Sequence, residues 1–219
     1  MPTSVHSLDV EVLPLLSGMK LPKASMLDVL SKTAGERANV RTTDPNSAAG
    51  YETWRWAIRF LREDTELAKL GWVQCDHGQV EGIRNDELRI KLVPCSMDKH
   101  TGDPAPEKMP RNVRERGPAA KKMIERNGRQ VVMDFMEGPS PDPIDDYDFW
   151  YFGIRISDDY VTAEISRPDS VTDKGFIEHY SSRIIVAKPG DLDGLRVRDA
   201  VPEDFAAIDA PAIRRKSTT

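Results

Sequence analysis

Residues 149–165 read FWYFGIRISDDYVTAEI, and this stretch is the best guide to the fold. Its first eight residues are mostly apolar and aromatic, as in a buried strand, and the SDD that follows has turn chemistry. Residues 160–165 then alternate between apolar and polar positions, which indicates a second strand running back along the first. Residues 176–187 predict a third strand. The C-terminal third therefore predicts an antiparallel sheet.

The first seventy residues predict helices. Residues 25–33 place Met26, Val29 and Leu30 on one helical face, and residues 50–70 carry a broad apolar face whose two tryptophans we expect in the core. The run 8–16 contains acids and a proline but no basic leader, which favours an entry strand or coil over a signal peptide.

These segments predict one α+β domain over residues 1–219, with N-terminal helices packed on a mainly antiparallel sheet. Residues 96–143 are rich in charge and proline, and we expect them to form a mobile insertion within that domain. Residues 209–219 are expected to be a flexible tail.

Both cysteines and two of the four histidines fall within 26 residues, as Cys75, His77, Cys95 and His100. Thiolates and imidazoles are the usual ligands of tetrahedral zinc. A hairpin folded at Asn85 would bring Cys75 opposite Cys95, within a residue of register. The cluster therefore suggests a zinc site.

Other interpretations of these residues remain open. The spacing matches none of the zinc patterns with two residues between cysteines, and cysteine often serves as a small buried hydrophobe. A disulfide across paired strands is geometrically possible, but two cysteines in 219 residues are typical of a cytoplasmic protein.

Composition limits the class of protein. Hydrophobic residues make up 39% and charged residues 31%, and the net charge is −5. No stretch is long and apolar enough to cross a membrane, so we expect a soluble cytoplasmic protein without a membrane partner. The negative charge argues against a dedicated duplex-DNA binder, which needs a basic face.

Charge is nevertheless uneven along the chain. Between Lys108 and Arg129 there are eight basic residues and two acids. Lys121, Lys122 and Arg126 fall on a short predicted helix, where they form a candidate surface for phosphate or another anion. The alternative is an ordinary solvated helix face.

A second cationic stripe lies on the helix predicted at residues 50–70. Arg55, Arg59 and Arg62 recur at helical spacing, and arginine is suited to carboxylate and phosphate. Glu52, Glu63 and Glu66 lie three or four residues away, so a salt-bridged surface is the alternative to an anion site.

Catalytic residues are harder to find. If the third strand lies beside the second, Glu164 comes near His179, and the pair could share acid and base chemistry. The acids around Asp146 could bind a hard cation. Phosphate-binding, dinucleotide-binding, serine-hydrolase and zinc-protease motifs are absent, so the sequence leaves open whether the protein is an enzyme.

Two functions fit these features. The first is a non-catalytic intracellular binding or accessory protein whose charged insertion meets an anionic partner, either nucleic acid or an acidic protein. The second is a metal-dependent phosphoester hydrolase or nuclease that uses the Cys/His cluster or the acids near Asp146 and Glu164.

Overall fold

A computed structural model describes residues 2–129, 147–157 and 159–192. Within them, seven strands form one mixed sheet in the order β1-β7-β6-β5-β4-β3-β2. β1 lies parallel to β7 and β4 parallel to β5, and the other neighbours are antiparallel. The strands are β1 (Ser4–His6), β2 (Trp72–Cys75), β3 (Gly82–Asn85), β4 (Ile90–Ser96), β5 (Asp148–Ile156), β6 (Val161–Val171) and β7 (Ile177–Ala187).

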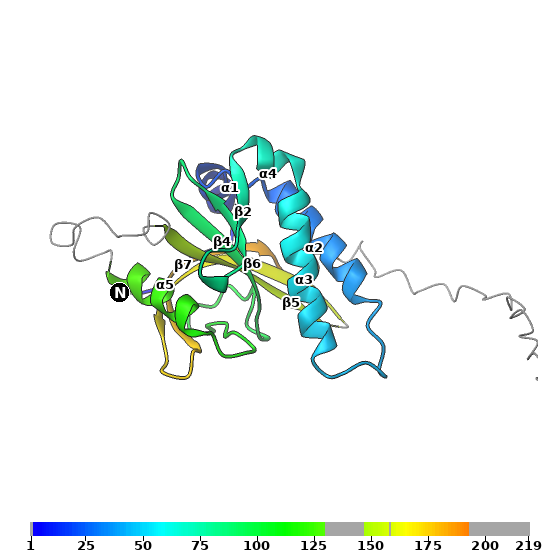
Figure 1. Ribbon diagram of the computed structural model, residues 1–219. Helices are drawn as coiled ribbons and strands as arrows, with labels where there is room; N and C mark the ends of the chain where they lie inside the picture. Colours follow the sequence, from blue (N-terminus) through cyan, green and yellow to red (C-terminus); the bar gives the residue numbers. More distant parts are fainter. Residues whose placement is uncertain (1, 130–146, 158, 193–219) are drawn as a thin grey trace, which may run out of the picture.

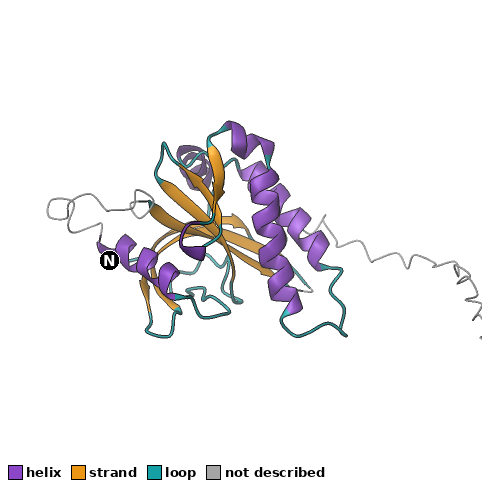
Figure 2. Ribbon diagram, in the orientation of Figure 1, coloured by secondary structure: helices purple, strands orange, loops and turns teal. Residues whose placement is uncertain are grey.

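Helices cover both faces of this sheet (Figures 1 and 2). The helices are α1 (Asp9–Gly18), α2 (Lys23–Arg37), α3 (Ala48–Glu63), α4 (Thr65–Lys69) and α5 (Pro118–Arg129), with a short 3-10 helix η1 (His77–Gln79). The first three pack on one face over a core that includes Leu92, Phe152 and Ile184. α5 packs on the opposite face over a smaller core that includes Tyr151 and Tyr180. The α+β class expected from the sequence is confirmed.

The N-terminal segment corrects one expectation. Residues 8–16 were expected to be a strand or coil, but α1 begins at Asp9 and contains Pro14. Val12, Leu16 and Met19 recur at helical spacing and are buried in the larger core. This period was masked in the sequence because apolar residues also fall on the exposed side of α1, where Val10 is 78% exposed.

The long helix predicted at residues 50–70 is interrupted. Asp64 has an extended backbone that ends α3, and its carboxylate accepts a hydrogen bond of 2.9 Å from the N–H of Leu67, which caps α4. Ala57 and Leu61 are the residues of α3 that enter the larger core, whereas Trp54 and Trp56 are only half-buried. The expectation that both tryptophans are core residues is therefore wrong.

The hairpin predicted from the cysteine spacing is also wrong. The chain makes two hairpins: β2 pairs with β3, and β3 pairs with β4 across a turn at residues 86–89. Asn85 closes β3 and is buried, because its side chain donates to the carbonyl of Leu70 and accepts from the N–H of Leu88. Strand β3 therefore separates Cys75 from Cys95.

Part of the predicted insertion is described. Residues 97–117 cross the face of the sheet that carries α5, whereas residues 130–143 and the tail at 209–219 lie outside the described residues. No helix in the described ranges combines the length and apolar character needed to cross a membrane.

Candidate functional site

A fully buried ion pair joins strands β6 and β7. The Nε and Nη2 atoms of Arg183 donate to the two carboxylate oxygens of Glu164 at 3.0 and 2.7 Å, and both side chains are 0% exposed. Burying two charges costs several kcal/mol per ion unless every remaining polar atom finds a partner. The contacts around the pair must therefore supply those partners.

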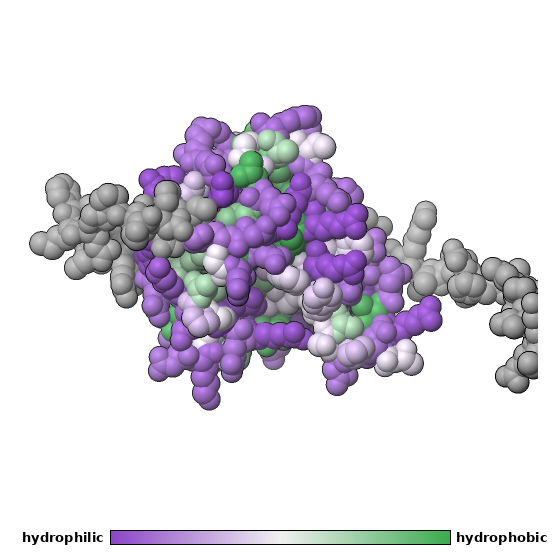
Figure 3. All heavy atoms as spheres, viewed as in Figure 1, coloured by the Kyte–Doolittle hydropathy of each residue, from purple (hydrophilic) through white to green (hydrophobic). Residues whose placement is uncertain are grey.

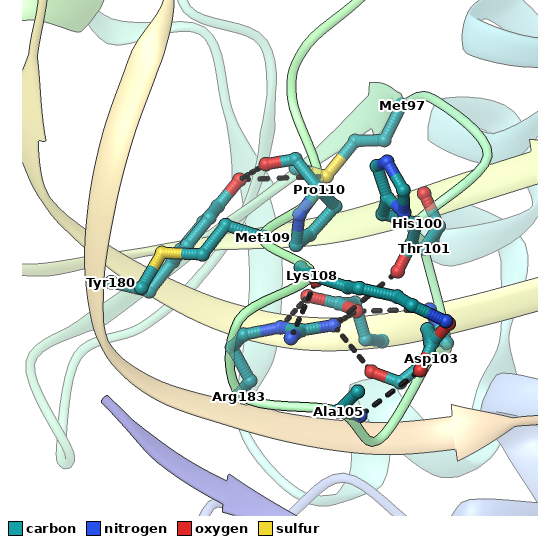
Figure 4. Close-up of polar contacts among 12 residues, drawn as sticks. Met97, His100, Thr101, Asp103, Ala105, Lys108, Met109, Pro110, Tyr180 and Arg183 are labelled. Carbon is teal, nitrogen blue, oxygen red and sulfur yellow. Dashed lines mark hydrogen bonds and ion pairs between the residues drawn. The ribbon is translucent and has the colours of Figure 1, made fainter. Parts of the chain in front are cut away.

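A loop of the predicted insertion supplies them. The guanidinium of Arg183 also donates to the carbonyl oxygens of Asp103 at 3.0 Å and Lys108 at 3.2 Å, while Glu164 accepts the N–H of Gly102 at 3.0 Å. The loop thus surrounds the guanidinium of Arg183, as Figure 4 shows. The two buried side chains therefore hold the backbone of the loop against the sheet.

Two further contacts hold the same loop, which we define as residues 97–112. The Tyr180 hydroxyl donates to the carbonyl of Pro110 at 2.9 Å. Gly102 has a φ of 77°, and a Cβ there would lie 2.9 Å from both the carbonyl oxygen of Ala187 and the Cβ of Thr162. Only glycine fits this position without a shift of the backbone.

The outer side of this loop forms a pocket of about 480 Å³, here called the lysine pocket. It is lined by Lys99, Thr101, Gly102, Asp103, Pro104, Tyr160, Lys188 and Pro189. Figure 3 shows the molecular face seen in Figure 1, where hydrophilic residues predominate and apolar residues are scattered.

The charge of the lysine pocket is positive. The ammonium groups of Lys99 and Lys188 make no hydrogen bond or ion pair within the described residues, although Lys188 lies in electrostatic range of Asp9, which pairs with Lys23 at 2.7 Å. The carboxylate of Asp103 is compensated, because it accepts from the N–H of Ala105 and the ammonium of Lys108, each at 3.0 Å. These contacts hold the pKa of Asp103 below its ordinary value.

The four residues of the predicted zinc site do not form a ligand set. Cys75 lies on β2, where it is opposite Gly82 of β3, and Cys95 lies on β4, on the other side of β3. At least two strand spacings of about 4.8 Å therefore separate the two cysteines. No group of three or more His, Cys, Asp or Glu side chains in the described ranges could hold a metal ion. His77 lies in η1. His100 lies in the loop beside Arg183, and its backbone carbonyl accepts a hydrogen bond of 3.4 Å from the guanidinium of Arg183.

Both cysteines are free, buried thiols. The Sγ of Cys95 accepts a hydrogen bond of 3.1 Å from Nη2 of Arg116. Burial raises the pKa of the Cys95 thiol, and the charge of Arg116 offsets part of this rise. Cys95 is thus a protonated core residue at neutral pH, as the alternative interpretation of the sequence expected.

The arginine stripe on α3 is paired with acids. Arg55 meets Glu52 at 3.1 Å, Arg59 meets Glu63 at 2.9 Å, and Arg62 pairs with Asp76. Arg55 and Arg59 also lie over the ring of Trp56, at 4.7 and 5.1 Å from its centroid. This arrangement agrees with a salt-bridged surface, the alternative to an anion site.

The basic residues of α5 are also engaged. Lys121 donates to the carbonyl of Asp173 at 2.8 Å, and Lys122 and Arg126 have interaction partners of their own. The unpaired cations of the predicted insertion lie instead before α5. Arg111 and Arg114 are exposed there and have no ion pair within the described ranges.

The two candidate catalytic residues lie apart. Glu164 is opposite Ile185, whereas His179 is opposite Ser170, so about six residues of strand, roughly 20 Å, separate them. Glu164 is engaged with Arg183. The imidazole of His179 contacts Asp169 and Thr3 instead. Of the acids around Asp146, the three at positions 142, 145 and 146 lie outside the described residues, and Asp148 pairs with Arg167 at 2.9 Å.

From the sequence, Glu164 is only a catalytic candidate, and its partner Arg183 is not predicted. Arg183 begins the strand segment RIIVA, and Glu164 lies between two apolar residues of β6. Charged side chains are fully buried in strands only when they are paired. Two opposite charges in neighbouring apolar strands were therefore a usable signal for the ion pair. Lys99, Lys188 and Thr3 carried no comparable signal.

Comparison with known proteins adds no relative: no family model, curated protein or solved structure matches this chain.

Proposed function

We propose that the protein is a binding or accessory protein that holds a compact anionic group of its partner in the lysine pocket. The observation that carries this proposal is the pair of ammonium groups of Lys99 and Lys188, which make no ion pair within the described residues. They line a pocket whose wall at Gly102 is held by the buried ion pair. Lysine acts as a compact point charge that binds phosphate or carboxylate without a fixed orientation.

The rigid wall of the lysine pocket favours the binding of a ligand. Gly102 lies in the pocket wall, and its N–H is held by Glu164, so the backbone on which the pocket is built is ordered before a ligand arrives. A preformed site avoids the entropy cost of ordering a loop on binding. A volume of about 480 Å³ lies within the usual range for ligand pockets.

Charge near the pocket argues for a single anionic group over a long polyanion. Exposed Arg111 and Arg114 lie between exposed Glu107 and Glu115, so this segment is not a continuous basic tract. A nucleic acid that tracks along the surface requires such a tract. A terminal phosphate of nucleic acid or a carboxylate of an acidic protein requires only the pocket.

The alternative function, a metal-dependent phosphoester hydrolase, has no comparable support among the residues that the structure describes, which do not include Asp146. Glu164 is occupied by Arg183, and the Cys/His cluster is divided between separate strands. The Glu164 carboxylate is therefore not free to bind a metal, and the two cysteines lie too far apart to share one.

Binding can be measured by fluorescence anisotropy at about 50 mM salt, where electrostatic contacts are strong. We expect a short single-stranded oligonucleotide with a 5′ phosphate, or an acidic peptide, to bind the unaltered chain. An oligonucleotide without the terminal phosphate is expected to bind more weakly than its phosphorylated match.

The double variant Lys99→Gln/Lys188→Gln is expected to lose binding. Lys174→Gln is the matched control, because Lys174 is exposed in the turn at the opposite end of β6 and β7. For one or two phosphate contacts, log affinity is expected to fall with log salt with a slope of about 0.7 to 1.4. Equal binding by the double variant and the control would contradict the proposal.

A further inference from the structure

Thr3, His179 and Asp169 form a hydrogen-bonded array away from the lysine pocket. Nε2 of His179 lies 3.2 Å from the hydroxyl of Thr3, and its Nδ1 lies 2.6 Å from Oδ1 of Asp169. The three residues come from the chain just before β1, from β7 and from β6, and Thr3 and His179 are 176 positions apart. Tertiary structure alone brings them together.

The register of the sheet brings these three side chains together. β1 runs parallel to β7 with Ser4 opposite Ser182, so Thr3 falls at the level of Ser181, two residues from His179, within reach of its imidazole. In the β6–β7 ladder, Pro168 is opposite Tyr180 and Ser170 is opposite His179, so Asp169 is the extra residue of a β-bulge. Bulges redirect side chains and are common beside active sites. Here the bulge turns the carboxylate of Asp169 toward the imidazole.

The order hydroxyl, imidazole, carboxylate is that of an activated nucleophile. When Nδ1–H donates to Asp169, Nε2 is left to accept the proton of the Thr3 hydroxyl. The other contact of this hydroxyl is the Sδ of Met109 at 3.9 Å, and a thioether is only a weak acceptor. The imidazole is therefore the strongest base within reach of Thr3.

Neighbouring charges leave this array intact. Arg167 is held by Asp148 at 2.9 Å and by the Ser181 hydroxyl at 3.2 Å, and Glu178 accepts from Ser170 at 3.3 Å. Asp169 makes no ion pair with lysine or arginine in the described part of the chain, so its charge acts on His179. The side chains of His179 and Asp169 are 28% and 20% exposed, which leaves the array open to a small substrate.

We propose that this array is an acyl-transfer site for small, activated carboxylic esters. The Thr3 oxygen attacks the carbonyl carbon while its proton passes to Nε2 of His179, and that proton then leaves with the alcohol as the ester C–O bond breaks. Water next attacks the carbonyl carbon of the acyl-Thr3 ester and gives a proton to Nε2. The bond between that carbon and the Thr3 oxygen then breaks, the carboxylic acid leaves, and the proton on Nε2 passes to the Thr3 oxygen and restores its hydroxyl. Asp169 is a positioning residue that fixes the imidazole tautomer.

The test uses 4-nitrophenyl acetate with the full chain, and it reads both nitrophenol release and acetylation by peptide mapping. We expect an acetyl group on Thr3. Thr3→Val keeps the shape of the side chain and is expected to abolish this adduct, whereas Thr3→Ser is expected to retain it. His179→Gln is expected to lower turnover about a hundredfold or more, as loss of a general base does.

Asp169→Asn is expected to lower kcat with little change in KM, because it disturbs the tautomer of His179 and not substrate binding. Ser4→Ala is the control for a neighbouring hydroxyl and is expected to behave as the unaltered chain. Circular dichroism verifies that each variant is folded. The proposal is overturned if Thr3 stays unacetylated, or if folded Thr3→Val and His179→Gln both hydrolyse the ester at the unaltered rate. His179 would then serve only to tether the N-terminal strand.

Discussion

Arg183 and Glu164 neutralise each other in the interior of the sheet, 0% exposed, while the same two side chains hold the backbone of an outer loop. Removing either partner leaves an uncompensated buried charge. We expect Glu164→Gln to lower the free energy of unfolding by about 3 to 5 kcal/mol. Urea denaturation measures this change. Arg59→Gln, at the exposed pair with Glu63, is the control and is expected to cost under about 1 kcal/mol.

The conformation of Gly102 links the loop to the lysine pocket. Gly102→Ala places a Cβ 2.9 Å from the carbonyl oxygen of Ala187 at a φ of 77°, so we expect destabilisation by about 1 to 3 kcal/mol and weaker anion binding. Gly117→Ala is the matched control, since a Cβ there meets nothing within 4 Å. Similar melting temperatures for the two variants would show that the loop is not held as described.

Lys91 carries a charge that the fold disfavours. Its side chain is 1% exposed and donates to the carbonyl of His77 at 3.0 Å, and burial lowers its pKa below the ordinary 10.5. The unfolded chain therefore keeps this proton at pH values where the folded chain has lost it, and stability rises with pH up to about the unfolded value.

Comparison with Lys91→Met isolates this effect from the titration of other groups. The unaltered chain is expected to gain stability relative to the variant as pH rises from neutrality toward 10.5. Parallel curves of unfolding free energy against pH for the two chains would refute the lowered pKa.

Helix α3 carries core residues on one side and exposed ion pairs on the other. Leu61 is 1% exposed, and Leu61→Ala is expected to cost about 2 to 5 kcal/mol. Arg59→Ala removes an exposed ion pair with Glu63 and is expected to cost under about 1 kcal/mol. Thermal or urea unfolding distinguishes these values. An Arg59→Ala variant that stays stable but loses partner binding would instead identify the arginine stripe as a site.

Local patterns predicted much of the fold. The run at 149–165 became β5 and β6 because alternation and turn chemistry act within a few residues. The prediction failed for residues 71–96, since it missed that residues 82–85 form a strand of their own. Because β3 lies between β2 and β4, the two cysteines are not on neighbouring strands, and the predicted zinc site loses its basis.

The candidate sites depended on contacts that no local pattern contains. Lys188 meets the loop of Lys99 only after β7 has paired with β6, and Thr3 reaches His179 only after β1 has joined the edge of the sheet. The pairing of Arg55 and Arg59 with nearby acids, by contrast, follows from helical spacing and was one of the two interpretations that the sequence offered.

Anion binding at the lysine pocket is tested most directly by titrating inorganic phosphate into the ¹⁵N-labelled chain and following its backbone amide resonances. Saturable shifts confined to Lys99, Thr101, Gly102, Asp103, Tyr160 and Lys188 are expected, and Lys99→Gln/Lys188→Gln should abolish them. Shifts that rise linearly without saturation, or that cluster on α3 or α5, would contradict a binding site in this pocket.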